Sequence, residues 1–483
     1  MKPLSCAIAT AVIGWLCTAA LGQELNYNSF QRGTRSAMLG GAAVAGARDA
    51  SAIFYNPAGL AFSAEDGFDL SAQAVRWEST DFRDLVGEGE NVDTSSIDLI
   101  PLLLARHIAI DDENRFQLAV GLTSFQKREV GIQDLTRRTN DFLSGPDFPG
   151  TEQFSGRINN SISAAEYWAS AGFAYRAGDH VSFGVSPIIS YRQHRVVDQF
   201  SATLSPSPTL PISLSRDRVL DFYQFSYFLR FGVAWEVAEP LRFGFTASTP
   251  SRRIVGRGEV FQEEIITNGI VRADDSLGSL YGVGRQRGRD TNYRVPFHAD
   301  FGIEWDFAES WTVATSIQYW DRLKKRAVVD VNPFEPFYQG VPLESGNSSS
   351  PLLTFYDARQ EVINVSLGVE HHFDEANTGY FGFWTDFSPI EQGELKKSVA
   401  LRQPFVTRSS VDVYNFITGL SHRGESSIIT VGATVGFGTG RLFGPSVDFT
   451  SDDPSNLFGT PVPRKTDISL ITAGVVFSYQ YIF

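Results

Sequence analysis

Apolar and polar side chains alternate over long stretches of the chain. In residues 222–236 (FYQFSYFLRFGVAWE) every odd position from Tyr223 to Trp235 is apolar or aromatic, whereas the even positions include Gln224 and Arg230. A period of two places successive side chains on opposite faces of a β-strand. The apolar face is longer than that of a usual strand of ~5–6 residues. It is typical of a tilted strand with one face in lipid and the other in a wet lumen.

The same alternation recurs along the chain and predicts fourteen strands. Fourteen is an even number, as single-chain bacterial barrels require. The pattern therefore predicts an all-β fold, a transmembrane antiparallel β-barrel, which must close because an open sheet edge cannot exist in lipid. The expected strands are residues 68–77, 97–108 (interrupted by Pro101), 115–125, 167–176, 181–192, 222–236, 241–249, 295–307, 311–322, 362–372, 379–388, 412–421, 427–439 and 468–483.

The connections between these strands alternate between short and long. Short periplasmic turns and long external loops are the rule for such barrels, so both ends of the barrel are expected on the periplasmic side. The short connections contain AIDDEN, AGDH, AEP, AES, FDEANT and HRGES, and the long ones cover about residues 78–96, 126–166, 193–221, 250–294, 323–361, 389–411 and 440–467.

Residues 1–22 have the features of a secretory signal peptide: a basic start, an apolar run, and small residues where a signal peptidase cuts. Both cysteines lie in this segment, so the mature chain is expected to hold neither a disulfide nor a thiolate metal site. Loss of Lys2 with the signal changes the net charge from −14 to −15. An acidic chain without a basic stripe argues against nucleic-acid binding.

The segment 23–67 precedes the first expected strand and lacks sustained alternation. Fourteen strands enclose more space than their own side chains fill, so a barrel of this size leaves a channel or holds a plug. Asn56-Pro57 has the pattern of a helix N-cap followed by Pro at the first helical position, which predicts a short helix through Leu60. The segment either folds into the lumen as a plug or forms a capped turn in a linker.

The chain ends in GVVFSYQYIF, in which Phe477, Tyr479, Tyr481 and the final Phe483 share one face. Aromatic rings anchor a strand at the membrane interface. A terminal aromatic preceded by this alternation resembles the signal that the barrel-assembly machinery reads. That machinery is therefore an expected partner during biogenesis.

The stretch DASAIFYNPAGLA (residues 49–61), ahead of fourteen strands and this ending, resembles the FadL/TodX family of outer-membrane transporters for long-chain fatty acids and hydrophobic compounds. In that family the N-terminal segment is a hatch that plugs the barrel, with an Asn-Pro-Ala motif that matches Asn56, Pro57 and Ala58. The resemblance implies a signal peptide at 1–22, a hatch at 23–67 and a barrel at 68–483. It also implies a monomer in the outer membrane of a Gram-negative bacterium, in contact with outer-membrane lipid and lipopolysaccharide.

The family is also known for a kinked early strand that opens sideways into the membrane. Gly121 is the candidate for this kink, because a glycine inside a strand often marks a bend.

The predicted lumen face carries large apolar groups beside serines, which is typical of a path for hydrophobic ligands. The alternative is that these rings pack against the hatch. Several arginines also face inward by parity, either to pair with a carboxylate ligand or as solvated charges paired with Glu304, Glu370 or Asp386. The apolar residues are Trp168, Ile188, Phe228, Trp320 and Trp384, and the arginines are Arg176, Arg192, Arg230, Arg242 and Arg322.

The loop VNPFEPFYQGVPL places Phe334, Phe337 and Tyr338 outside the membrane. Exposed apolar clusters usually mean binding, so these residues are a candidate surface capture site. The alternative is that they pack against the neighbouring loop at 250–294.

No catalytic constellation emerges. His298, Asp300 and Glu304 lie along one strand without a convergent partner, which favours lumen residues over a metal or acid–base site. No nucleophile elbow and no Ser-His-Asp order is present. We therefore expect no enzyme activity, no cofactor and no metal.

The sequence predicts passive uptake of a hydrophobic small molecule, gated by the hatch. A long-chain fatty acid is the first candidate, and an aromatic or aliphatic hydrocarbon is the second. The alternatives are a structural or adhesive surface barrel and a polar-solute porin.

Overall fold

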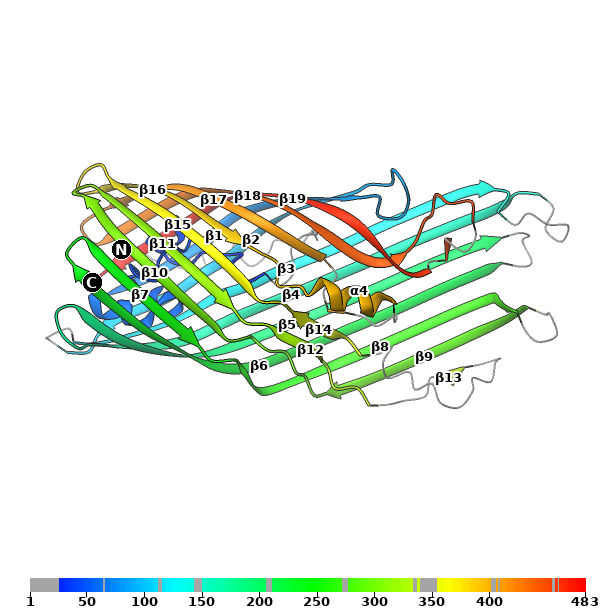
Figure 1. The fold of residues 1–483 in the computed structure, drawn as a ribbon, viewed down its shortest axis with the longest axis horizontal. Helices are drawn as coiled ribbons and strands as arrows, with labels where there is room; N and C mark the ends of the chain where they lie inside the picture. Colours follow the sequence, from blue (N-terminus) through cyan, green and yellow to red (C-terminus); the bar gives the residue numbers. More distant parts are fainter. Residues whose placement is uncertain are drawn as a thin grey trace, which may run out of the picture.

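The computed structural model describes residues 26–63, 66–111, 115–142, 150–205, 211–271, 277–332, 337–338, 354–400, 405–406, 409–453, 457–458 and 460–483. Over these residues the wall is a closed antiparallel barrel of fourteen strands (Figure 1). Each wall strand pairs with the next over at least part of its length, and the last pairs with the first, so the ring closes on itself. The wall strands are β1 (Gly67–Arg83), β2 (Val92–Ala109), β3 (Phe116–Asn140), β4 (Glu152–Arg176), β5 (Val181–Ser205), β6 (Ile212–Ala238), β7 (Leu241–Ser248), β10 (His298–Ala308), β11 (Trp311–Trp320), β15 (Val362–His372), β16 (Asn377–Asp386), β17 (Ser409–Arg423), β18 (Ser427–Ser446) and β19 (Thr460–Ile482).

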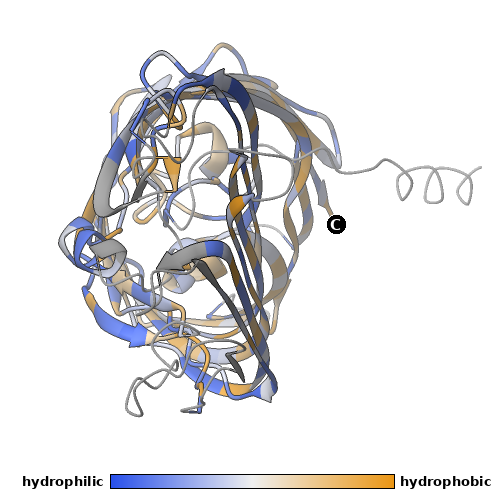
Figure 2. Ribbon diagram, turned by 90° about the vertical axis from the view of Figure 1, so that its right-hand side faces the viewer, coloured by the Kyte–Doolittle hydropathy of each residue, from blue (hydrophilic) through white to orange (hydrophobic). Residues whose placement is uncertain are grey.

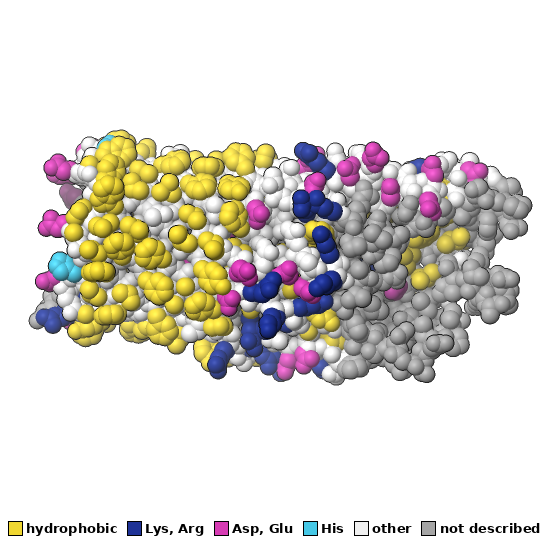
Figure 3. Space-filling view, viewed as in Figure 1, with side chains coloured by type: hydrophobic (Ala, Val, Ile, Leu, Met, Phe, Trp, Pro, Cys, Tyr) yellow, Lys and Arg dark blue, Asp and Glu magenta, His cyan; other side chains and the backbone are white. Residues whose placement is uncertain are grey.

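The two faces of the wall strands differ as the alternation predicts. In β6, Tyr227 is 44% exposed on the outer face, whereas its neighbour Phe228 is 1% exposed on the inner face. Apolar side chains cover the outer surface over one half of the molecule, and charged side chains begin where that band ends (Figure 3). This apolar band is the surface that a membrane barrel presents to lipid.

Both ends of the barrel lie at the end with the short turns (Figure 1). The Phe483 N–H donates to the carbonyl of Asp66 at 3.1 Å, which joins the end of the last strand to the start of the first. Short turns mark the periplasmic side of such barrels. The predicted common location of the two ends is therefore confirmed.

Four wall strands extend far beyond the apolar band. β3, β4 and β5 have 25 residues each and β6 has 27, whereas a tilted strand needs ~9–11 residues to cross the membrane. The prediction of loops at 126–166 and 193–221 is therefore wrong for most of these residues. Outside the membrane water wets the outer face, so the sequence there no longer alternates between apolar and polar side chains.

The other long connections also contain ordered elements. β8 (Arg252–Val271) and β9 (Leu277–Arg289) form a hairpin that pairs with β6. β12 (Leu323–Ala327) and β14 (Tyr356–Arg359) form a separate small sheet. The helix α4 (Gln392–Ala400) contacts β18 and β19. Among the described helices, none is long and apolar enough to cross a membrane.

The N-terminal segment folds into the lumen. It contains the short helices α1 (Arg35–Met38), α2 (Ala52–Tyr55) and η1 (Pro57–Phe62), and helices lie within the ring of strands when the barrel is seen along its axis (Figure 2). We call residues 26–63 the hatch. Its place inside the barrel confirms the predicted plug, whereas residues 1–25, with the expected signal peptide, lie outside the described residues.

Candidate functional site

Asn56 organises the hatch and ties it to the wall. Its Oδ1 accepts the Ala58 N–H at 3.1 Å and so caps the helix that Pro57 opens. Its Nδ2 donates to the carbonyl of Val44 at 2.8 Å and to that of Val233 in β6 at 3.0 Å. The predicted cap is present, although the helix is a 3₁₀ helix that runs to Phe62. One amide side chain thus joins two parts of the hatch to the barrel.

Inward-facing glycines let the hatch backbone lie directly on the wall. A Cβ at Gly184 would overlap the backbone of Pro57 and Ala58. A Cβ at Gly232 would overlap Asn56 and Pro57. Gly184 and Gly232 are directly paired across β5 and β6. Glycine weakens a strand because it packs no side chain there, so its use here indicates close backbone approach. Further wall glycines meet the hatch backbone in the same way, namely Gly244, Gly302, Gly368 and Gly382, whereas Gly172 makes room for the side chain of Ile53.

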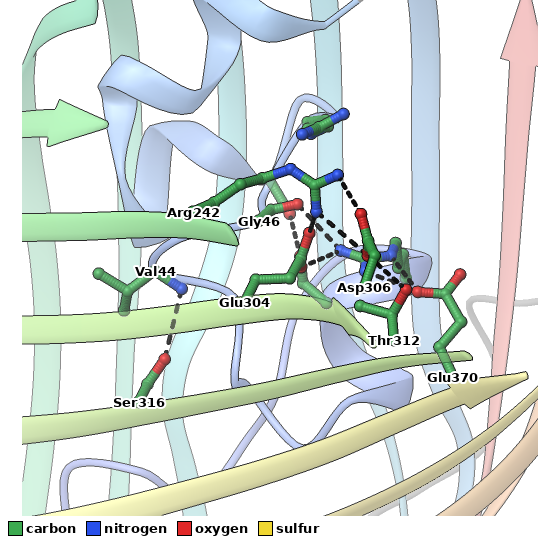
Figure 4. A network of polar contacts seen from close by, with 12 residues as sticks. Val44, Gly46, Arg242, Glu304, Asp306, Thr312, Ser316 and Glu370 are labelled. Atoms are coloured by element: carbon green, nitrogen blue, oxygen red, sulfur yellow. Dashed lines mark hydrogen bonds and ion pairs between the residues drawn. The ribbon is translucent and has the colours of Figure 1, made fainter. Parts of the chain in front are cut away.

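An ion-pair network joins the hatch to the wall near the periplasmic end (Figure 4). Arg35 of α1 pairs with Glu304 of β10 at 2.9 Å and with Glu370 of β15 at 2.6 Å. Arg242 of β7 pairs with Glu304 and Asp306. Because Glu304 is buried, loss of one partner would leave an uncompensated charge. We call these five residues the ionic latch.

Large rings fill the lumen beyond the hatch. Trp168 of β4 stacks on Phe125 of β3, with ring centroids 3.8 Å apart, and meets the edge of Phe228 at 5.0 Å. Trp320 of β11 stacks on Tyr27 of the hatch at 4.1 Å and on His298 at 3.9 Å. All are buried, and Ile188 belongs to the same apolar cluster. We call the rings the aromatic chamber: Tyr27, Phe125, Trp168, Phe228, His298 and Trp320.

Four of the predicted ligand-path residues lie together, three of them as rings of the aromatic chamber and Ile188 in the same apolar cluster. Trp168, Ile188, Phe228 and Trp320 all lie on the inner face as their parity indicates. The stacking of Trp320 on Tyr27, and of Trp168 beneath Arg32, also matches the alternative, in which the rings pack against the hatch. Their role in binding a ligand stays a prediction. His298 stacks on Trp320 and does not converge with Asp300 and Glu304, and no His, Cys, Asp or Glu cluster among the described residues could hold a metal ion.

Arg32 brings an unpaired charge into this apolar surrounding. Its guanidinium lies 5.3 Å from the ring of Phe125 and 5.9 Å from that of Trp168, and the residue is only 7% exposed. No described carboxylate pairs with it, and its Nε is buried without a hydrogen-bond partner. Burial lowers the pKa of the Arg32 guanidinium to about 10, which still leaves it charged at neutral pH. Buried charges are normally paired, so an unpaired one indicates a place for an anion.

The arginines predicted from strand parity are better satisfied than Arg32. Arg192 of β5 pairs with Glu166 of β4 at 2.9 Å, and both are buried. Arg230 hydrogen-bonds Ser248 at 3.0 Å and lies 3.8 Å from Asp300.

Two of these arginines do not line the path. Arg176 donates to the carbonyls of its own turn at Gly178 and Asp179, at the periplasmic rim. The inward placement of Arg322 is wrong, because β11 ends at Trp320 and Arg322 is 56% exposed where it pairs with Glu391.

The wall has a break in its hydrogen bonding between β2 and β3. These strands pair only from Ala109–Gln117 to Leu103–Thr123, and beyond that point β2 keeps β1 as its partner and β3 keeps β4. The β3–β4 ladder is irregular between Ser124 and Gln126, so the bulge lies at Phe125. Pairing continues regularly through Gly121, so Gly121 is the wrong kink site. We call the unpaired stretch, residues 92–102 against 124–140, the wall break.

A side chain bridges the wall break, and a small cavity lies beside it. Lys127 donates from Nζ to the carbonyl of Leu99 at 3.3 Å across the break. Phe30, Leu102 and Trp384 help to line a cavity of about 30 Å³, which has room for water but not for a lipid. Trp384 therefore lies beside this cavity, where its Nε1 donates to the Asn28 carbonyl at 2.9 Å.

The predicted capture loop is only partly described. Phe334 lies outside the described residues, and Phe337–Tyr338 form the short strand β13. β13 pairs with Val283 and Gly282 of β9, so its backbone lies against the 250–294 region, as the alternative interpretation expects. Capture itself stays a prediction.

Sequence reasoning missed Arg32, Tyr27 and Phe125. The hatch has no strand period, so nothing in its sequence shows which way Arg32 or Tyr27 points. Phe125 shares the parity of Thr123, which is buried on the inner face of β3. The parity of β3 therefore predicts that Phe125 points into the lumen.

A closed fourteen-stranded barrel, plugged by its own N-terminal segment and with an unpaired stretch between two early strands, has the architecture of an outer-membrane transport barrel. No family model matches the sequence, and no curated protein matches it. Solved structures do match. The P. putida toluene transporter TodX is 15% identical, with 94% of this chain and 99% of that chain covered at a TM-score of 0.56.

Two further structures agree. A Pseudomonas aeruginosa FadL homologue is 13% identical, with 96% of this chain and 100% of that chain covered at a TM-score of 0.55. The Ralstonia pickettii toluene transporter TbuX is 15% identical, with 95% and 99% covered at 0.51. The chain thus has the fold of the FadL/TodX-type outer-membrane channels, which confirms the resemblance seen in its sequence.

Proposed function

We propose that the protein is a passive channel for uptake of hydrophobic small molecules across the outer membrane, and that its substrate is a long-chain fatty acid. One observation carries the choice of substrate: the buried, unpaired guanidinium of Arg32 beside the aromatic chamber. A fatty acid supplies both a carboxylate for this cation and an apolar chain for the rings. A neutral hydrocarbon, such as the substrate of the toluene transporters of similar fold, would leave the charge buried and unpaired.

The proposed route leads from the outside through the chamber and into the membrane at the membrane-side end of the wall break, where the pairing of Leu103 with Thr123 ends. Arg32 lies against Phe125, the residue at the bulge of β3 where pairing with β2 has ended. A carboxylate bound to Arg32 therefore places its chain next to the break. The small cavity beside Leu102 cannot hold a ligand, so passage requires the hatch to move.

Gating by the hatch follows from the contacts that hold it. Asn56 and the ionic latch fix the hatch to β6, β10 and β15. A ligand can shift such an equilibrium only if it binds the open state better than the closed one. A carboxylate at Arg32, which is itself part of the hatch, makes a contact that can differ between the two states.

The test compares an acid and a neutral solute in the same protein. Arg32→Gln is reconstituted in liposomes or expressed in a deletion strain, and uptake of labelled oleate, toluene and a small sugar is measured. Because a hydrogen bond to a charged group contributes about 1.5–3 kcal/mol, oleate uptake should fall roughly ten- to hundredfold. Toluene uptake should not fall. Arg195→Gln, at an arginine 58% exposed on the outer face of β5, is the matched control and should leave both unchanged.

Each other outcome favours a named alternative. Equal loss of oleate and toluene, or no loss, would refute the role of Arg32. Toluene uptake without oleate uptake in the unmodified protein would favour a hydrocarbon channel. Sugar flux alone would favour a polar-solute porin, and no flux from an assembled barrel would favour a structural or adhesive role.

A further inference from the structure

Phe449 is a buried ring on a loop outside the membrane. It follows β18, and its ring lies 5.4 Å from that of Phe154 and 6.2 Å from that of Phe200. A Cβ built on Gly156 would lie 2.6 Å from its ring atom Cζ. The ring therefore fills the space that a side chain at position 156 would occupy. Phe449, a loop residue, thus fills a recess in the inner wall of the barrel.

The recess is built by the register of three extended strands. Gly156 of β4 lies opposite Thr136 of β3 and Ala202 of β5, so the floor consists of small side chains. The next inward pair on one side is Phe154 with Leu204, and on the other side it is Ile158 with Phe200. Small residues flanked by large apolar ones make a socket of the width of one ring or one alkyl chain. We call it the outer socket: Gly156, Ala202, Phe154, Leu204, Ile158 and Phe200.

The loop that fills the outer socket is held by polar contacts near the surface and by three buried apolar side chains, Val447, Phe449 and Leu457. Arg138 of β3 donates to the carbonyls of Phe449 at 2.9 Å and Ser451 at 3.1 Å, and it pairs with Asp452 at 2.8 Å. Asp452 is 68% exposed. Exposed ion pairs contribute little to stability, so the cost of withdrawing the loop lies mainly in exposing its apolar side chains, and an apolar ligand that takes the place of Phe449 offsets part of that cost.

The outer socket is continuous with the aromatic chamber through apolar contacts. Phe154, Phe200 and Phe449 belong to one buried cluster, and Trp168 and Trp320 belong to another. Ile162 packs against both clusters. Ile162 is thus the apolar link between the outer socket and the chamber, and it lies between the inward polar pairs Asn160–Asp198 and Glu166–Arg192.

We propose that the outer socket is a binding site for an apolar chain or ring of the transported molecule, and that Phe449 occupies it as a built-in stand-in. This inference rests on the proposed function. When the loop withdraws, an alkyl chain or a phenyl ring takes the place of the Phe449 ring between Phe154 and Phe200. The loop then acts as a competitor that a hydrophobic ligand must displace.

The first experiment measures binding of the fluorescent probe N-phenyl-1-naphthylamine to the full chain. Phe449→Ala removes the competitor and should lower the apparent Kd at least about fivefold, because a site closed most of the time binds with a proportionally reduced affinity. Adding Gly156→Leu to Phe449→Ala fills the socket from its floor and should abolish this gain. Phe245→Ala, whose ring is 49% exposed on the outer face of β7, and Gly178→Leu, at a turn in open space, are the matched controls.

A second measurement tests the inference even if the socket collapses when Phe449 is replaced by alanine. No cysteine follows Cys17, so Phe449→Cys provides a single reactive thiol after signal cleavage. Maleimide labelling of this thiol should be slow in the free protein and severalfold faster with saturating oleate. An unchanged labelling rate, together with unchanged probe affinity in Phe449→Ala, would overturn the inference.

The two proposals fail in different ways. Arg32→Gln should remove oleate uptake while the Phe449→Ala gain in probe affinity persists. If Phe449→Ala gives no gain in probe affinity and oleate uptake is intact, only the inference about the outer socket is refuted. Probe binding that follows the prediction in a barrel that takes up no oleate would refute the proposed function and leave the socket standing.

Discussion

Replacement of Asn56 by alanine tests whether the hatch is held by the contacts described above. The side chain makes three hydrogen bonds: to the Ala58 N–H, to the Val44 carbonyl and to the Val233 carbonyl. Each contributes about 1 kcal/mol net, and the first is also the helix cap, whose loss costs about the same. The closed hatch should therefore lose about 3 kcal/mol. At about 1.4 kcal/mol per tenfold, its opening should become roughly a hundredfold more frequent.

Hydrogen exchange followed by mass spectrometry measures this opening directly. Amides of residues 44–58 exchange only when the hatch leaves the wall, so their protection should fall by the same factor. Asn56→Ser keeps a capping oxygen but loses both donations, and it should lose about 2 kcal/mol, or roughly thirtyfold protection. Heat-dependent electrophoretic mobility reports whether the barrel has assembled. Protection within about threefold of the unmodified protein for Asn56→Ala, with the barrel intact, would refute the argument.

Two further changes test the packing of the lumen. Gly184→Val should expel the hatch from β5, because its side chain would overlap the backbone of Pro57; limited proteolysis should then cut the hatch while the barrel resists, and an intact hatch would contradict the close contact. Glu166→Ala should lower thermal stability by about 3–5 kcal/mol, because it leaves Arg192 buried without its partner. A loss below about 1 kcal/mol in a denaturant titration would show that water replaces the carboxylate.

The wall strands could be predicted because the membrane imposes the alternation. Lipid accepts Tyr227 and Trp235 on one face of β6, and the lumen surrounds Gln224 and Arg230 on the other, so parity alone separates the faces. The same rule placed Trp168 and Phe228 correctly. It failed for Arg322, which follows the end of β11, because parity has no meaning once the strand has stopped.

The extended strands and the candidate anion site were not predictable by that rule. Both faces of the outer part of β3 are polar or mixed, so its 25-residue length leaves no periodic signal. Arg32 lies in a segment of short helices and turns, where side-chain direction depends on packing against the wall. The wall break is equally hidden, because missing pairs between β2 and β3 change no residue type on either strand.

The glycines of the wall explain how a plug can be both close-fitting and able to move. At Gly184 and Gly232 the hatch backbone lies against the wall backbone, with no side chain of the wall reaching between the two. Interdigitated side chains would have to unpack one by one, whereas a smooth contact of this kind can part over a short distance. Asn56 and the ionic latch around Glu304 are two of the polar holds on the hatch, and Asn28 and Ser29 make a third, to Asp386 of β16. Asn56 is the hold that lies on the glycine surface itself, so its replacement tests how firmly the hatch is fixed at this smooth contact.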